Sequence, residues 1–117
     1  MSEYYRLKDR VLPWLVSELG FSAFVMESGF PEGLAVNDWV LGGAGDLEQV
    51  ADTGITYAFG ECAEMRAQLR WMRDWNAQHE GTVRFDGIDA PGSVGRATRG
   101  DFPIELRQVR CYRQDDR

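Results

Sequence analysis

Only two segments of this 117-residue chain are convincing β-strands, residues 21–27 and 82–89, and this limits its fold more than any other feature. The first runs from Phe21 to Glu27 and lies between a glycine and a Ser-Gly break. A short, mostly apolar segment bounded in this way is typical of a parallel strand that is buried on both faces. The second ends at an Ala-Pro-Gly turn.

Helical patterns precede and separate the two predicted strands. An apolar stripe predicts a helix over residues 2–19, which Pro13 is expected to kink or to delay at its start. Further helices are expected over about 31–41, 47–52 and 61–78. Strands that alternate with helices pair in parallel through right-handed crossovers, so the pattern predicts an α/β fold.

A parallel sheet of two strands cannot cover its own faces, and independent stability needs about three strands or more. We therefore expect a partial parallel sheet with flanking helices that is a fragment of a larger domain. Unpaired strand edges favour association with other chains. A chain that is not a complete domain is thus expected either to associate with itself through the open edges of its sheet or to need a partner chain that completes the sheet.

The charge of the chain is negative overall but unevenly distributed. It has 19 acidic and 13 basic residues and a net charge of −6, which argues against nucleic acid and anionic membranes as partners. Residues 1–95 carry 15 acidic and 7 basic residues, whereas residues 96–117 carry 6 arginines and 4 acidic residues. We accordingly divide the chain into a partial domain, 1–94, and a divergent arginine-rich tail, 95–117.

Nothing in the sequence predicts export or insertion into a membrane. No apolar run approaches the roughly 20 residues that span a bilayer, and the first ten residues lack the apolar core of a signal peptide. Cys62 and Cys111 do not form a Cys-x-x-Cys pair. A cytoplasmic location is therefore expected.

Two carboxylates follow the predicted strands at their carboxyl ends, where open α/β sheets bind ligands. Glu27 ends the first strand and Asp89 ends the second, so the two side chains are expected at one rim of the sheet if the strands are neighbours. Paired carboxylates could steer a base or bind a cation. In the alternative interpretation Glu27 is a solvated loop residue and Asp89 bonds its own turn.

Two polar residues fall on predicted apolar helix faces. Lys8 lies within the stripe of the first helix, where a buried ammonium would need a partner such as Glu27, or would extend its charge out to water. Asn37 shares a sector with apolar residues of the second helix and would need hydrogen bonds if buried.

The sequence holds no complete catalytic set. No serine lies in the Gly-x-Ser-x-Gly elbow of a hydrolase triad, and His79, the only histidine, does not make a zinc site with two distant cysteines. The Gly-rich segment 42–45 lacks the Lys-Ser/Thr of a phosphate-binding loop. No metal and no cofactor are expected.

Five blocks of sequence, in their order and spacing, resemble the erythromycin esterase family: Glu3–Lys8, Leu19–Ser28, Asn37–Gly43, Trp71–Asn76 and Phe85–Asp89. The resemblance implies an α/β hydrolase considerably longer than this chain. In those members of the family that open macrolide lactones, which are small-molecule substrates, the resemblance implies a histidine as general base on water. That histidine belongs to a Gly-Glu-x-x-His-Gly block that would precede Met1, so we expect these residues alone to lack the base.

The resemblance also implies roles for individual residues. Glu27 matches the strand-end carboxylate of the cleft, and Lys8 stands where the family usually has arginine. Glu3 matches the acid that follows the histidine block. Asp89 matches the end of the second strand motif, and Asn37 lies in a matching block. We expect Glu27 and Lys8 to be catalytic and Glu3, Asn37 and Asp89 to bind substrate in a hydrolase fragment. The alternative is a non-catalytic remnant or subunit.

Overall fold

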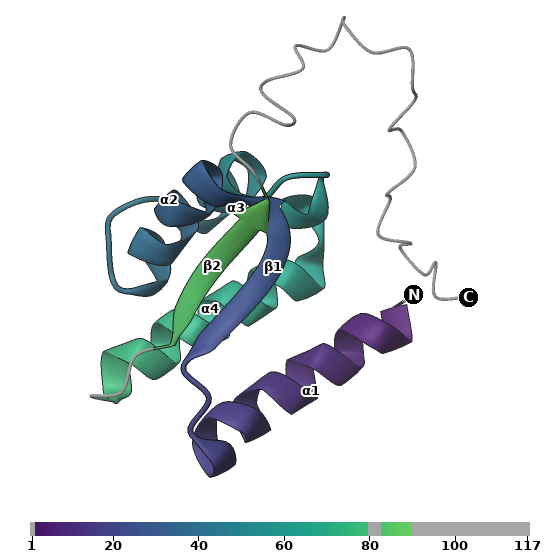
Figure 1. The fold of residues 1–117 in the computed structure, drawn as a ribbon, viewed down its shortest axis with the longest axis vertical. Coiled ribbons are helices and arrows are strands. Elements are labelled where there is room, and N and C mark those ends of the chain that lie inside the picture. The colour runs from purple at the N-terminus through teal and green to yellow at the C-terminus, as the bar shows by residue number, and fades with distance from the viewer. Residues whose placement is uncertain (1, 80–82, 90–117) are drawn as a thin grey trace, which may run out of the picture.

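The computed structural model describes residues 2–79 and 83–89, which alternate helices and strands as the sequence predicts. The division at residues 94 and 95 lies outside these residues. Figure 1 shows the elements in chain order, and their bounds are α1 Ser2–Leu19, β1 Ala23–Gly29, α2 Phe30–Val40, α3 Leu47–Gly54, the 3-10 helix η1 Phe59–Glu61, α4 Ala63–Gln78 and β2 Arg84–Asp89. The predicted α/β class and the two parallel strands are confirmed.

The two strands lose their regular register near their carboxyl ends. Met26 pairs with Gly87, but the next paired residues are Gly29 and Asp89. Two residues of β1, Glu27 and Ser28, therefore lie opposite the single residue Ile88. Such a bulge bends its strand and changes the direction of the side chains beside it.

The edge of β2 that faces away from β1 is occupied by side chains from the helices. The backbone N–H of Arg84 donates toward β1, so the neighbouring N–H groups of Val83 and Phe85 point outward. Asn76 of α4 accepts from Val83 N at 2.7 Å, and Asn37 of α2 accepts from Phe85 N at 3.0 Å. Asparagine is a good residue for this purpose because its amide offers both a donor and an acceptor.

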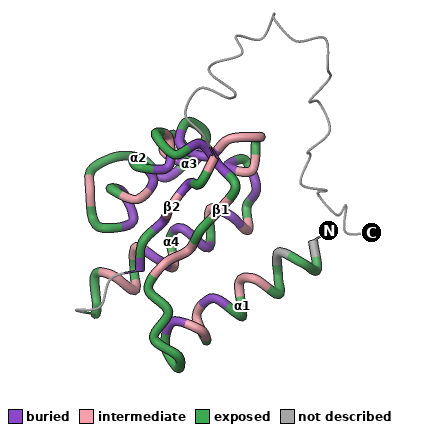
Figure 2. The backbone as a smooth tube through the Cα atoms, viewed as in Figure 1, coloured by how far each residue is buried: buried purple, intermediate pink, exposed green. Residues whose placement is uncertain are grey.

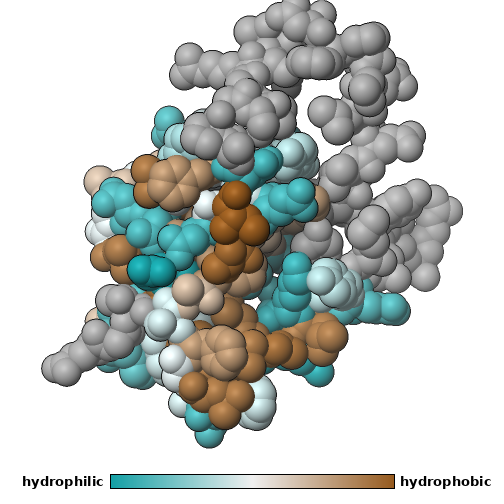
Figure 3. Space-filling model, in the orientation of Figure 1, coloured by the Kyte–Doolittle hydropathy of each residue, from teal (hydrophilic) through white to brown (hydrophobic). Residues whose placement is uncertain are grey.

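The hydrophobic core lies on one face of the sheet. Its largest fully buried side chains come from α2, α4 and the β2 segment: Phe85, Met65, Leu69, Met72, Val36, Val40 and Val83. On the other face Val25 is 53% and Ile88 65% exposed. Figure 2 shows that buried and exposed residues occur within the same strands, and Figure 3 shows hydrophobic side chains on the viewer's side of the sheet. The prediction that the first strand is buried on both faces is therefore wrong, because the described helices pack against one face only.

Helix α1 packs through a narrow part of its apolar stripe. Leu12 and Val16 are buried, whereas Tyr4, Leu7 and Leu19 are each more than half exposed. Its partner is α4, and the helix runs through Pro13 without a break and begins at Ser2, so the predicted late start is wrong. Within residues 2–79 and 83–89, no helix is both long enough and apolar enough to cross a membrane.

Candidate functional site

The bulge in β1 lies at the end of the sheet where the sequence predicts a site. Glu27 is exposed and lies within the bulge, whereas Ser28 beside it is fully buried. Asp89 is the last residue of the neighbouring strand and pairs with Gly29. The structure thus places the two predicted carboxylates at the same end of two hydrogen-bonded parallel strands.

A tyrosine forms a hydrogen bond with one of these two carboxylates, Asp89. The hydroxyl of Tyr57 donates a hydrogen bond of 2.9 Å to Oδ2 of Asp89. This hydrogen bond raises the pKa of Tyr57 above its ordinary value of 10.0, with further contributions from burial and from the negative charges of Asp89 and Glu27. The charge of Glu27 contributes least, and the direct contact is the one between Tyr57 and Asp89.

The loop that carries Tyr57 has an unusual backbone. Tyr57 and Ala58 both adopt φ of 61°, the left-handed region that non-glycine residues seldom occupy. The loop is anchored to β1 because Thr56 N donates to the buried Oγ of Ser28 at 3.0 Å, and its hydroxyl donates to the same oxygen at 3.3 Å. Strained residues that are held by their surroundings cluster at functional sites.

Glycines allow β1, β2 and α2 to approach closely behind this rim. A Cβ at Gly87 would lie 2.5 Å from the carbonyl oxygen of Gly29, and one at Gly33 would lie 2.9 Å from Gly87 N. Both distances are shorter than real Cβ contacts, so a side chain at either position would push the two strand ends or α2 apart.

The other predicted site residues lie away from the rim. Glu3 is exposed in the first turn of α1. The ammonium of Lys8 lies 4.6 Å from the centre of the Tyr4 ring on the same helix, a cation–π contact. Asn37 lies on α2 and holds β2 through its bond to Phe85.

Sequence reasoning missed Tyr57, Ser28 and Thr56. The segment 54–60 has only the composition of a loop, and no pattern in it indicates that Tyr57 returns to the end of a strand 32 positions later. The Ser28–Thr56 contact spans 28 positions and is equally invisible to periodicity.

The chemistry open to this site is that of carboxylates and a phenol. A carboxylate can accept a proton or hold a cationic partner, and the Tyr57 hydroxyl, whose single proton is donated to Asp89, can still accept a hydrogen bond. Among the described residues, no group of three or more histidine, cysteine, aspartate or glutamate side chains is placed to hold a metal ion.

Comparison with known proteins identifies the family. The sequence model of the erythromycin esterase family matches residues 16–102, which is more than half of the chain and includes Glu27, Tyr57 and Asp89. The chain belongs to the erythromycin esterase family. Glu3 and Lys8 lie before the matched range.

Relatives in this family are much longer than the chain. It is 28% identical over 95 residues to an erythromycin esterase type II of Escherichia coli, a match that covers 81% of the chain and 22% of that relative. A crystal structure of a Bacillus cereus protein is 36% identical, with a TM-score of 0.63, over 73% of the chain and 20% of that protein. A crystal structure described as a succinoglycan biosynthesis protein is 29% identical, with the same TM-score of 0.63, over 73% and 21%. The chain thus corresponds to about a fifth of the length of its relatives.

Proposed function

We propose that these residues contribute the carboxylate side of an active site that hydrolyses an ester or lactone of a small molecule, with macrolides as the first substrates to test. The observation that carries the proposal is the exposed Glu27, which lies in a strand-end bulge beside the Tyr57–Asp89 pair, in a chain of the erythromycin esterase family. Bulges occur often next to active sites because they redirect a side chain.

In this hydrolysis the oxygen of a water attacks the carbonyl carbon while a general base takes its proton. The ring C–O bond then breaks, and the alkoxide that leaves receives a proton. The base that the family resemblance implies is a histidine from a block before Glu3. Glu27 stabilises the positive charge that this histidine acquires, because an opposite charge nearby favours an ionised group.

Other residues support this centre. Asp89, oriented by Tyr57, contacts a hydroxyl of the substrate. Glu3 and Lys8 lie on α1, away from the rim, and would have to bind a more distant part of the substrate. Asn37 acts indirectly, because its amide oxygen accepts a hydrogen bond from Phe85 N and so fixes the position of the strand that ends in Asp89.

Erythromycin hydrolysis tests the proposal in two forms of the protein. The chain alone is expected to show no turnover because its 117 residues do not include the Gly-Glu-x-x-His-Gly block. The chain extended by its flanking coding sequence, with an in-frame Gly-Glu-x-x-His-Gly block, is expected to hydrolyse the lactone, and Glu27→Gln is expected to lower kcat by about 10²–10⁴-fold.

The matched control is Glu18→Gln in the extended protein. Glu18 lies in the last turn of α1, just before the loop that leads into the amino end of β1. Glu27 lies near the opposite, carboxyl end of that strand. Unchanged turnover is expected for this variant. Turnover that is insensitive to Glu27→Gln, or turnover by the chain alone, would contradict the proposal.

A second candidate function is that of a non-catalytic subunit that needs a partner chain. The observation that favours it is the exposed apolar side chains of Val25 and Ile88 on the uncovered face of the sheet. Size-exclusion chromatography over a dilution series distinguishes the two candidates. A concentration-dependent assembly favours the subunit, and a monomer at every concentration counts against it.

A further inference from the structure

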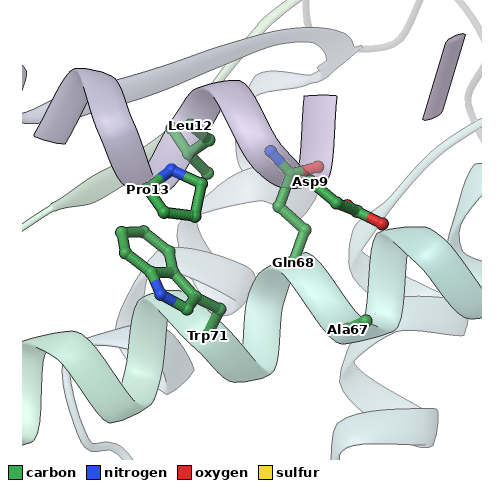
Figure 4. Close-up of a pocket in the computed structure, with 6 residues that line it drawn as sticks. All are labelled: Asp9, Leu12, Pro13, Ala67, Gln68 and Trp71. Atoms are coloured by element: carbon green, nitrogen blue, oxygen red, sulfur yellow. The ribbon is translucent and has the colours of Figure 1, made fainter. Parts of the chain in front are cut away.

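A cavity of about 190 Å³ lies between α1 and α4, away from the strand-end rim. Figure 4 shows that α1 contributes Asp9, Leu12 and Pro13, and that Gln68 and Trp71 rise from α4 toward them. The proposed hydrolase site uses none of these side chains.

Two polar atoms at this cavity are buried without a hydrogen-bond partner among the described residues. They are Oδ1 of Asp9, an acceptor, and Nε2 of Gln68, a donor. Gln68 is only 4% exposed, so its amide has little contact with bulk water. A buried polar group that lacks a partner is costly, and each such group in a folded protein calls for an explanation.

A hydroxyl group matches the two atoms in its hydrogen-bonding capacity. A hydroxyl donates its proton to the carboxylate of Asp9 and accepts from the amide of Gln68. An anion would be repelled by Asp9 and by the nearby Glu64, whose charge helps to raise the pKa of Asp9. The polar part of the site therefore suits a neutral alcohol better than an anion.

The rest of the cavity is apolar and small. Leu12, Pro13 and Trp71 form its walls, and the Trp71 ring is held by stacking on Trp75 at 5.5 Å between ring centres. Pockets for drug-sized ligands measure roughly 300–1,000 Å³, whereas an engineered cavity of about 150 Å³ holds benzene. The observed volume thus fits a single ring.

We propose that this cavity is a binding site for a neutral cyclic alcohol, with the ring against Trp71 and Pro13 and a hydroxyl between Asp9 and Gln68. The site is separate from the proposed hydrolase centre, and its test does not require turnover.

Cyclohexanol titrated into the purified chain, followed by amide NMR, tests the proposal. Shift changes are expected at Asp9, Gln68 and Trp71, with a dissociation constant on the order of 1 mM for so small a ligand. Cyclohexyl methyl ether is the matched ligand. Its oxygen accepts but cannot donate to Asp9, so roughly fivefold to tenfold weaker binding is expected in the unaltered chain.

Gln68→Leu provides a second test because it removes the donor while keeping a side chain of similar size. It is expected to weaken cyclohexanol binding by a similar factor. Gln78→Leu is the control, since Gln78 lies exposed at the end of the same helix. This variant is expected to bind cyclohexanol as tightly as the unaltered chain.

Methyl glucopyranoside separates two sources of the alcohol. Tighter binding than cyclohexanol identifies a sugar ring, and weaker binding identifies a simple cyclic alcohol. The proposal is overturned if no shifts arise at the cavity residues, if alcohol and ether bind equally, or if an ordered water stays between Asp9 and Gln68 when cyclohexanol is present.

Discussion

Ser28 holds together parts of the chain that are far apart in sequence. Its fully buried hydroxyl accepts from Thr56 N, and this bond anchors the strained loop of Tyr57 to β1. Ser28→Ala leaves that N–H without a partner and is expected to lower the free energy of unfolding by about 1–3 kcal/mol in urea denaturation. The control Ser17→Ala removes an exposed hydroxyl and should cost less than about 0.5 kcal/mol. Equal costs for the two variants would mean that Ser28 does not anchor the loop.

Tyr57 is expected to ionise at a higher pH than an ordinary tyrosine. The hydrogen bond to Asp89, then burial and the charges of Asp89 and Glu27, raise its pKa above 10.0. The folded state thus holds the proton more tightly than the unfolded state. The resulting stability is fully present below about pH 10 and is lost as the pH rises through the folded pKa.

Asp89→Asn tests this pH dependence because it removes the acceptor charge. Spectrophotometric titration of the tyrosines should show the pKa of Tyr57 falling toward its ordinary value. Asp38→Asn, an exposed change on α2, is the control and should leave the titration unchanged. A pKa of Tyr57 that does not respond to Asp89→Asn would contradict the assignment.

Asp9 should make the chain less stable as the pH rises above the ordinary carboxyl range. Burial, and next the charge of Glu64, raise its pKa above 3.8. Because the folded state binds this proton more tightly, its contribution to stability falls as the pH rises from about 4 through the folded pKa. Asp9→Asn should flatten this part of the profile and raise the unfolding temperature near pH 7. The exposed change Asp74→Asn should do neither, and a profile that Asp9→Asn leaves unchanged would rule out this role.

At the scale of elements, α1 depends on few contacts for its position. Leu12 is 8% exposed and faces α4, whereas Leu7 on the same helix is 58% exposed. Leu12→Ala is expected to cost about 2–4 kcal/mol of unfolding free energy, and Leu7→Ala less than about 0.5 kcal/mol. Chemical denaturation followed by circular dichroism measures both, and equal costs would mean that α1 does not dock on α4 through Leu12.

The sequence predicts where the helices and strands lie better than it predicts which of their faces are buried. The alternation of apolar runs with helical stripes correctly identified β1, β2 and their parallel pairing, because periodicity is a local property. It could not reveal the bulge at Glu27 and Ser28, which depends on the register between strands about 60 positions apart. It also failed for Val25, since a run of apolar residues does not say whether a second layer of helices covers them.

The candidate site was partly predictable for the same reason. Glu27 and Asp89 follow their strands directly, so topology alone placed them at one end of the sheet. Tyr57 reaches Asp89 through a loop with two left-handed residues, Tyr57 and Ala58, neither of which is a glycine that would have indicated such a turn.

At the scale of the molecule, the sheet face that none of the described helices covers should govern association. Ile88 is 65% exposed and Val25 53% exposed on this face. Ile88→Lys is expected to weaken self-association severalfold in analytical ultracentrifugation without altering the circular dichroism spectrum, because a charge opposes burial of the face. Leu34→Lys, at an exposed site on α2, is the control. An equal effect of both variants would mean that association is unspecific.

The two helix asparagines that accept hydrogen bonds from β2 leave the sheet only one edge at which it can grow. Asn76 and Asn37 already take the outward N–H groups of Val83 and Phe85, and Gly33 of α2 lies too close to Gly87 for another backbone to pass between them. A strand that joins this sheet must therefore hydrogen-bond to β1, the strand that bears Glu27. Any segment that extends the sheet, whether from the same polypeptide or from another, becomes an immediate neighbour of that carboxylate.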